Sequence, residues 1–329
     1  MARRSEADEA SIEQKLAELD ALPDRALQSE PLAAALAHKH YRVVAKAARL
    51  AADALLYDLV PALRAAYPRF LDKPVKADPN CFAKKAIVRA LVALDYEDAE
   101  FFSAGLQLKQ MEPVWGGTAD TAADVRASCA MGLVASGNPR ALVAITQLLY
   151  DPEPDARVGA VRAAAYGNPR EAELLLRAKV LARDAEPAIL GECFSALLSV
   201  EPEESLAFVA TYLKDPDDVL RELAALAIGE SRAPGAVEIL RNAWNEVLVG
   251  EELRLALIRG AAAHRSEAAF DWLLSIAAEA RPPVAEQVIE SLALYKHNAR
   301  LAQRLAAVLE ERGDGALRKI YEKLWKSAP

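Results

Sequence analysis

Two stretches within the first 126 residues gather side chains that could bind an anionic or an apolar group. Residues 69–89 hold six basic side chains against two acidic ones, although the whole chain of 329 residues carries a formal charge of −8. Residues 107–126 place apolar side chains beside two consecutive glycines and then turn polar. Ammonium groups attract carboxylates, and tryptophan is a frequent anchor at interfaces. The predicted binding residues are Lys73, Lys76, Lys84, Lys85, Met111, Trp115, Asp120 and Thr121.

These residues predict a division of roles within one site. The four lysines would form a cationic rim, and Met111 and Trp115 would form an apolar floor. Helix N-termini expected near Asn80 and Thr121 would add backbone N–H donors. Such a site suits an acidic peptide or a small anionic group. Trp115 also has a structural interpretation, because large aromatic side chains are usually mostly buried and this one could plug a gap in the core.

The elements that must position these residues are copies of one helical hairpin. Residues 214–229, KDPDDVLRELAALAIG, begin with a turn that can cap a helix and continue with the apolar spacing of one helical face. Gly229 is a candidate C-cap of that helix. With Arg221 as a marker, the equivalent positions are Val44, Lys84, Arg126, Arg157, Leu190, Arg221, Arg254 and Ala285. The last six are separated by 31 or 33 residues, a step that predicts stacked helical pairs.

The segments DPEPDARVGAVRAA (151–164) and DPDDVLRELAALAIG (215–229) resemble HEAT repeats, and more narrowly the bacterial type also found in phycobilisome lyases. The resemblance implies an all-α, right-handed α-solenoid that mostly serves as a binding scaffold. It divides the chain into an N-terminal tail and capping helix (1–29), a repeat array (30–310) and a C-terminal capping helix (311–329).

In such arrays the marker arginine hydrogen-bonds to a turn aspartate of its own or a neighbouring repeat. The resemblance therefore implies that the recurring charged residues form a structural ladder. This interpretation is favoured over a row of ligand-binding arginines, because repeated charges usually belong to the architecture. The ladder residues are Arg126, Arg157, Arg221, Arg254, Asp124, Asp155 and Asp218.

The first two repeats are longer than the others. Val44 to Lys84 spans 40 residues and Lys84 to Arg126 spans 42, against 31 or 33 later. Both additions precede the marker helix in adjacent repeats, near residues 69–80 and 107–121. They should therefore emerge from the same edge of the stack. Insertions gathered on one face of a repeat protein are often its binding face.

The residues contain no recognisable catalytic motif. The four histidines, His38, His40, His264 and His297, have no metal-ligand spacing, and no phosphate loop, HExxH or GxSxG is present. A bilin-lyase role is one enzymatic alternative, and it rests only on the repeat subtype.

The other alternative is a HEAT-like alkylpurine DNA glycosylase. Enzymes of that class use an aromatic, an acid and an arginine, for which Trp115, Asp120 or Asp124, and Arg157 are candidates. They also need a strongly cationic cleft, which the acidic balance of this chain opposes.

Composition and charge set the remaining expectations. Cys81, Cys129 and Cys193 lie in apolar helical stretches, which predicts buried thiols in a reducing compartment. The chain lacks an apolar signal segment and any stretch of membrane-spanning length, so we expect a cytoplasmic protein that does not engage membranes. Its acidic balance disfavours general nucleic-acid binding. Residues 184–230, with eleven acidic and two basic side chains, predict a solvated face or, alternatively, a surface for a basic partner.

The sequence as a whole predicts a non-catalytic scaffold that binds a protein or an acidic peptide. It predicts no cofactor and no metal, and it leaves the oligomeric state open.

Overall fold

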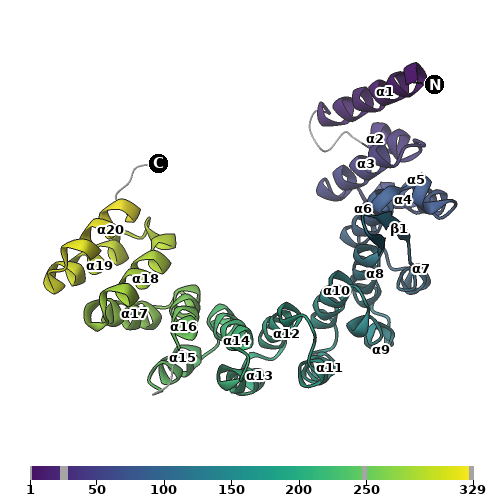
Figure 1. Cartoon of the computed structure of the whole chain (residues 1–329). Coiled ribbons are helices and arrows are strands. Elements are labelled where there is room, and N and C mark those ends of the chain that lie inside the picture. Colours follow the sequence, from purple (N-terminus) through teal and green to yellow (C-terminus); the bar gives the residue numbers. More distant parts are fainter. Residues whose placement is uncertain (1, 23–28, 247–249, 326–329) are drawn as a thin grey trace. The chain divides into compact units, whose positions relative to one another are not determined.

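The computed structural model describes residues 2–22, 29–246 and 250–325. Its internal contacts divide the chain into two compact units, residues 1–175 and 176–329. Helices dominate both units (Figure 1), and the sheet found among the described residues is a single two-stranded one. The predicted all-α solenoid class is confirmed, whereas the division into two units was not predicted from the sequence.

The first unit contains most of the shorter helices and the two strands. Its elements are α1 (Ala2–Asp20), α2 (Ser29–Leu36), α3 (Tyr41–Asp53), η2 (Tyr57–Leu59), α4 (Val60–Ala66), η3 (Tyr67–Phe70), α5 (Pro74–Ala77), η4 (Pro79–Cys81), α6 (Phe82–Ala93), α7 (Ala99–Gly105), β1 (Met111–Val114), β2 (Gly117–Asp120), α8 (Ala123–Ala135), α9 (Ala141–Ile145), η5 (Leu148–Tyr150) and α10 (Pro154–Ala165).

The second unit is more regular, and α11 (Pro169–Ala182) crosses the boundary between the two. The elements that follow α11 are α12 (Pro187–Val200), α13 (Pro202–Ala210), η6 (Thr211–Lys214), α14 (Asp218–Ser231), α15 (Ala236–Trp244), α16 (Glu251–His264), α17 (Glu267–Glu279), α18 (Pro282–Leu292), η7 (Ala293–Tyr295), α19 (Ala299–Arg312) and α20 (Gly315–Trp325).

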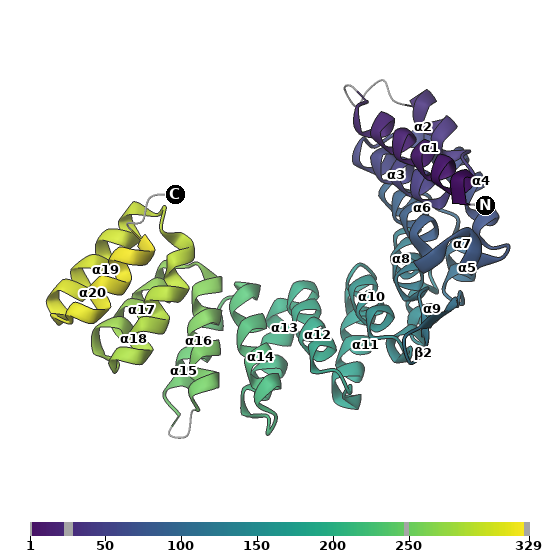
Figure 2. The same ribbon diagram turned by 45° about the horizontal axis from the view of Figure 1, so that its top comes forward.

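The helices that carry the marker position form the packed row of each unit. In the first unit α3 packs on α6, α6 on α8, and α8 on α10. In the second unit α12 packs on α14, α14 on α16, and α16 on α18, and the turned view shows these neighbours side by side (Figure 2). Every marker residue lies within the first turns of one of these helices. The repeat register read from the sequence is therefore confirmed.

Helix α14 shows why the repeat sequence folds in this way. Asp217 is its N-cap, and the side chain accepts a 2.9 Å hydrogen bond from the Val219 N–H. The buried face that follows consists of Leu220, Ala224, Ala225, Ala227 and Ile228. A capped start and a face of small and branched apolar residues let the helix lie close to its neighbours.

The expectation that Gly229 ends α14 is wrong. The helix continues to Ser231, and Arg232 is the C-cap with a left-handed φ of 52°. Gly229 instead lies where α14 crosses α16, and a Cβ atom there would be 1.9 Å from the carbonyl oxygen of Gly260. The glycine is required by close helix packing rather than by a turn.

Helix α20 packs on α18 and α19 at the C-terminal end of the second unit. Leu317, Tyr321 and Trp325 form its buried face, and the Trp325 indole donates a hydrogen bond of 3.3 Å to the Ile289 carbonyl oxygen. Residues 326–329 of the predicted C-terminal cap, and 23–28 of the predicted N-terminal segment, lie outside the described residues. None of the described helices is both long and apolar enough to cross a membrane.

Candidate binding site at the insertion edge

The second insertion forms a β-hairpin, which the sequence did not predict. Strands β1 and β2 pair antiparallel, with Met111 opposite Asp120 and Val114 opposite Gly117. The two residues left to make the turn are Trp115 and Gly116, and Gly116 has a φ of +86°. Glycine adopts this backbone conformation without a steric cost.

Trp115 lies at the tip of the hairpin with a relative exposure of 103%. Met111 and Val114 on the same hairpin are also about half exposed, at 53% and 49%. The interpretation of Trp115 as a plug in the core is therefore wrong. The predicted apolar floor is an apolar projection instead, which keeps these side chains available to a partner.

The first insertion consists of η3, α5 and η4, joined by unusual backbone conformations. Lys73, Asn80 and Cys81 all have positive φ values, of 46°, 54° and 53°. These conformations are disfavoured for residues with a side chain, and the surrounding contacts must hold them in place. Lys73 and Lys76 are exposed, as a cationic rim requires.

Lys84 does not belong to that rim. Its side chain has a relative exposure of 0%, and its Nζ lies 2.9 Å from Asp78 Oδ2 and 3.1 Å from the Phe70 carbonyl oxygen. The Asp78 carboxylate also accepts the backbone N–H groups of Ala83 and Lys84 itself. Lys84 occupies the marker position, which faces the interior of the stack in the neighbouring repeat as well. Its charge is therefore used inside the fold.

A buried hydrogen-bond network joins the two insertions. Glu112 Oε1 accepts hydrogen bonds from the Asn80 N–H at 2.6 Å, from Gln110 Nε2 at 2.7 Å and from Thr121 Oγ1 at 2.6 Å. Gln110 Nε2 also donates to the Asp78 carbonyl oxygen at 2.9 Å. The prediction that both insertions emerge at one edge is confirmed by these contacts. We call residues 69–81 and 107–121 together the insertion edge.

The network that holds the base of the hairpin contributes a stability that depends on pH. Burial alone would raise the pKa of Glu112, but the hydrogen bonds from Thr121, Gln110 and the Asn80 N–H lower it below its ordinary value of 4.5. A carboxyl group whose folded-state pKa is lowered contributes stability above its unfolded pKa, and this is lost as the pH falls through the folded value.

We therefore expect the free energy of unfolding of the first unit to fall more steeply below pH 4.5 in the wild type than in a Glu112→Gln variant. Urea titrations followed by circular dichroism at several pH values measure this slope. Glu97→Gln, an exposed carboxylate in the same unit, serves as the control and should keep the wild-type slope. Equal slopes in all three proteins would contradict a role for Glu112.

The remaining predicted site residues have structural partners. Lys85 Nζ lies 2.5 Å from Asp124 Oδ2 on α8, so this lysine is only partly available to a ligand. Asp120 lies 2.7 Å from Arg126 and is nearly buried. Thr121 takes part in the network rather than offering a helix N-terminus. Of the predicted binding residues, those that remain exposed are Lys73, Lys76, Met111 and Trp115.

The marker arginines are engaged within the turns, and of the three predicted acids Asp218 pairs with its marker arginine whereas Asp124 and Asp155 do not. Arg126 bridges Asp120 of its own turn and Asp151 of the next repeat, at 2.7 and 2.8 Å. Arg157 donates to the carbonyl oxygens of Asp151 and Pro152 at 2.8 and 3.0 Å.

The predicted partners Asp124 and Asp155 stand two residues before the arginine, whereas Arg126 and Arg157 contact the aspartate that stands six residues before each of them. Asp124 pairs with Lys85, and Asp155 is exposed in the first turn of α10.

Arg221 and Arg254 complete the comparison. Arg221 pairs with Asp218, as expected, and also donates to the Asp215 carbonyl oxygen at 2.7 Å. Arg254 also contacts an aromatic ring, with its guanidinium carbon 5.2 Å from the centre of the Trp244 ring. The residue six positions before Arg254 is a leucine rather than an aspartate.

The ladder has a sequence signal that a search at a fixed offset would find. Asp78, Asp120, Asp151, Asp184 and Asp215 each stand six residues before a marker position. Four of them accept the backbone N–H two residues further on; these are Asp120, Asp151, Asp184 and Asp215. The same spacing identifies the buried pair of Asp78 and Lys84.

The residues proposed for a glycosylase site are not assembled into one. Asp120 is bound to Arg126, Arg157 is bound to turn carbonyl groups, and Trp115 stands at a hairpin tip. Among the described residues, no three or more His, Cys, Asp or Glu side chains are grouped so that they could hold a metal ion.

Comparisons with known proteins give distant structural likenesses. No protein-family model matches the chain, and no curated protein matches its sequence. The complex of CpcE and CpcF of phycocyanin lyase from Nostoc sp. PCC7120 is similar over 89% of this chain and 97% of that one, with 16% identity and a TM-score of 0.37. Human deoxyhypusine hydroxylase is similar over 87% and 99%, with 16% identity and a TM-score of 0.30. The fold assignment rests on the stacked helices themselves.

Proposed function

We propose that this protein is a non-catalytic scaffold that binds an acidic protein partner through the insertion edge. The observation that carries the proposal is the full exposure of Trp115 on a hairpin whose base is held by a buried network. The network holds the backbone of the hairpin that carries this indole, so less backbone freedom is lost when a partner binds. Tryptophan is among the residues that most often dominate binding energy.

Trp115 alone would not give a stable complex. Burying a tryptophan removes about 150–250 Å² from water, which corresponds to about 4–6 kcal/mol. Association costs about 4–15 kcal/mol in lost freedom. The partner must therefore also cover Met111 and Val114, which are half exposed on the same hairpin. A cleft that receives the whole tip would do so.

The charge of the insertion edge favours an acidic partner. Its exposed ionic side chains include Lys73, Lys76 and Lys109 against Asp72. The carboxylates of Glu112 and Asp120 are engaged inside the fold and add little to the surface potential. Exposed lysines steer an acidic partner and orient it, and salt weakens this attraction.

We expect a Trp115→Ala variant to bind the partner at least about 2 kcal/mol more weakly, which is a roughly 30-fold rise in Kd. The measurement begins with affinity capture from cells that produce the protein and continues with titration of the purified partner. Tyr166→Ala is the matched control, because Tyr166 is 74% exposed but lies outside the insertion edge. If Tyr166→Ala lost binding while Trp115→Ala retained it, the binding site would lie outside the insertion edge.

A further inference from the structure

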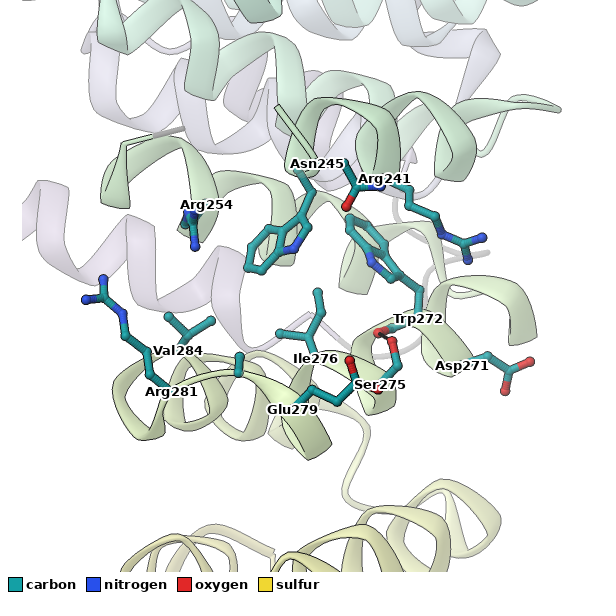
Figure 3. A pocket seen from close by; sticks show the side chains of 12 residues that line it. Arg241, Asn245, Arg254, Asp271, Trp272, Ser275, Ile276, Glu279, Arg281 and Val284 are labelled. Carbon is teal, nitrogen blue, oxygen red and sulfur yellow. Dashed lines mark hydrogen bonds between the residues drawn. The ribbon is translucent and has the colours of Figure 1, made fainter. Parts of the chain in front are cut away.

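The second unit contains a cleft that the proposed function does not use. It has a volume of about 670 Å³ and is lined by α15, α16, α17 and the start of α18. We call it the tryptophan cleft; the lining residues that matter here are Arg241, Trp244, Arg254, Trp272, Ile276 and Arg281 (Figure 3). Pockets of about 300–1,000 Å³ with apolar walls and a few polar groups typically hold small organic ligands.

The apolar part of the tryptophan cleft is formed by two indole rings and an isoleucine side chain. The rings of Trp244 and Trp272 meet edge to face, with centroids 6.2 Å apart and an interplanar angle of 88°. Ile276 lies between the polar groups of the two sides in Figure 3. Edge-to-face indoles are held by mutual attraction, and together with Ile276 they favour a rigid aromatic body.

Arginines stacked on these indoles supply the polar groups. The guanidinium carbon of Arg254 lies 5.2 Å from the Trp244 ring centre, and that of Arg241 lies 5.9 Å from the Trp272 ring centre. A guanidinium over an aromatic face is already oriented, and its N–H groups remain at its edge. Figure 3 shows Arg254 and Arg281 on one side of the cleft and Arg241 on the other.

The acidic residues of the cleft do not cancel this positive character. Three arginines face two lining carboxylates, Asp271 and Glu279, and Arg241 Nη1 also lies 3.6 Å from Glu238 Oε2 outside the lining. Asp271 is bound by Arg304, which is not part of the cleft, and its side chain is directed away from Ile276 in Figure 3. Arg281 pairs with Glu251, but both side chains are exposed, so a ligand carboxylate can replace Glu251 at low cost.

We propose that the tryptophan cleft binds a small organic acid, in which one carboxylate is attached to a flat apolar body. The carboxylate contacts Arg254 and Arg281, and the flat body lies against Trp244, Trp272 and Ile276. The proposal is independent of the insertion edge, because every one of these residues belongs to the second unit.

Calorimetric titration of the full chain tests this with two probes of matched shape, 2-naphthoate and 2-naphthalenemethanol. We expect saturable binding of the acid at one site and at least about tenfold weaker binding of the alcohol, since only the acid carries a charge that the arginines can hydrogen-bond. Arg254→Met and Arg281→Met should each weaken naphthoate binding at least about fivefold. Arg281 is 59% exposed, so its substitution tests the site without disturbing the core.

Arg259→Met is the control, because Arg259 is exposed on α16 but does not line the cleft. It should leave the affinity for naphthoate unchanged. The proposal would be overturned by any of three results: equal binding of the acid and the alcohol, equal effects of the control and test variants, or no saturable binding of the acid. Tighter binding of a capped Glu-Phe-Glu tripeptide than of naphthoate would also overturn it, because the cleft would then be a peptide groove.

Discussion

Replacing Lys84 by methionine is expected to destabilise the first unit by about 3–5 kcal/mol. Methionine retains much of the aliphatic stem, so the main loss is the ammonium group. The Asp78 carboxylate would remain at 0% exposure with its two backbone donors but without its countercharge. An unpaired charge in a low-dielectric interior is costly, which makes this a larger effect than the loss of an ordinary hydrogen bond.

Chemical denaturation followed by circular dichroism measures this loss, and hydrogen exchange at the amides of α6 and η4 locates it. Lys85→Met is the adjacent control. Lys85 is partly exposed in its pair with Asp124, so its removal should change the free energy of unfolding by about 1 kcal/mol or less. Similar losses in the two variants would show that the buried pair has no special role.

Replacing Gly229 by alanine is expected to destabilise the second unit by about 3 kcal/mol. The new methyl carbon would lie 1.9 Å from the Gly260 carbonyl oxygen, far inside van der Waals contact. The obstacle is backbone rather than the end of a flexible side chain, so α14 and α16 must move apart. Their separation would loosen the face formed by Ala225, Ile228 and Leu257.

Thermal and urea denaturation of Gly229→Ala should show this loss, and Gly315→Ala provides the comparison. Gly315 is at the start of α20, where a methyl group would have no neighbouring atom within 4 Å and the backbone φ is not positive. Alanine there should be neutral or stabilising by up to about 1 kcal/mol, because it restricts the unfolded chain. If Gly229→Ala were as stable as Gly315→Ala, the close helix crossing would not exist in solution.

The repeat register could be predicted because spacing alone determines it. Arg157, Leu190 and Arg221 stand in equivalent turns of α10, α12 and α14 although their side chains differ. The apolar face of a helix repeats with the chain, so one well-patterned copy predicts the others. The contact between the two insertions followed from the same register.

Composition could not predict whether an individual side chain is buried or exposed. Lysine is seldom buried, which favours a surface position for Lys84, yet its register position points inward and Asp78 stands six residues before it. The hairpin was missed because its strands have only four residues each and include Pro113 and Gly117. Strands this short depend on the Gln110, Glu112 and Asn80 contacts beneath them rather than on propensity.

The cleft of the second unit was missed for a different reason. Trp244 and Trp272 are 28 positions apart and meet only when α15 and α17 pack together. The marker position places Arg254 in the ladder. The sequence sign of a change at this repeat is the leucine six residues before Arg254, where five earlier repeats have an aspartate. The spacing of residues within one repeat does not predict which side chains of neighbouring repeats come into contact.

The three cysteines described above give the molecule its own reporters of local opening. Cys81 and Cys129 are buried in the first unit and Cys193 in the second. Burial raises the pKa of Cys129 to about 12 and that of Cys193 to about 12. A thiol reacts with alkylating or disulfide reagents as the thiolate, so these groups are protected twice, by lack of access and by protonation. In each unit of the native chain, therefore, the buried thiols react only after the helices around them separate.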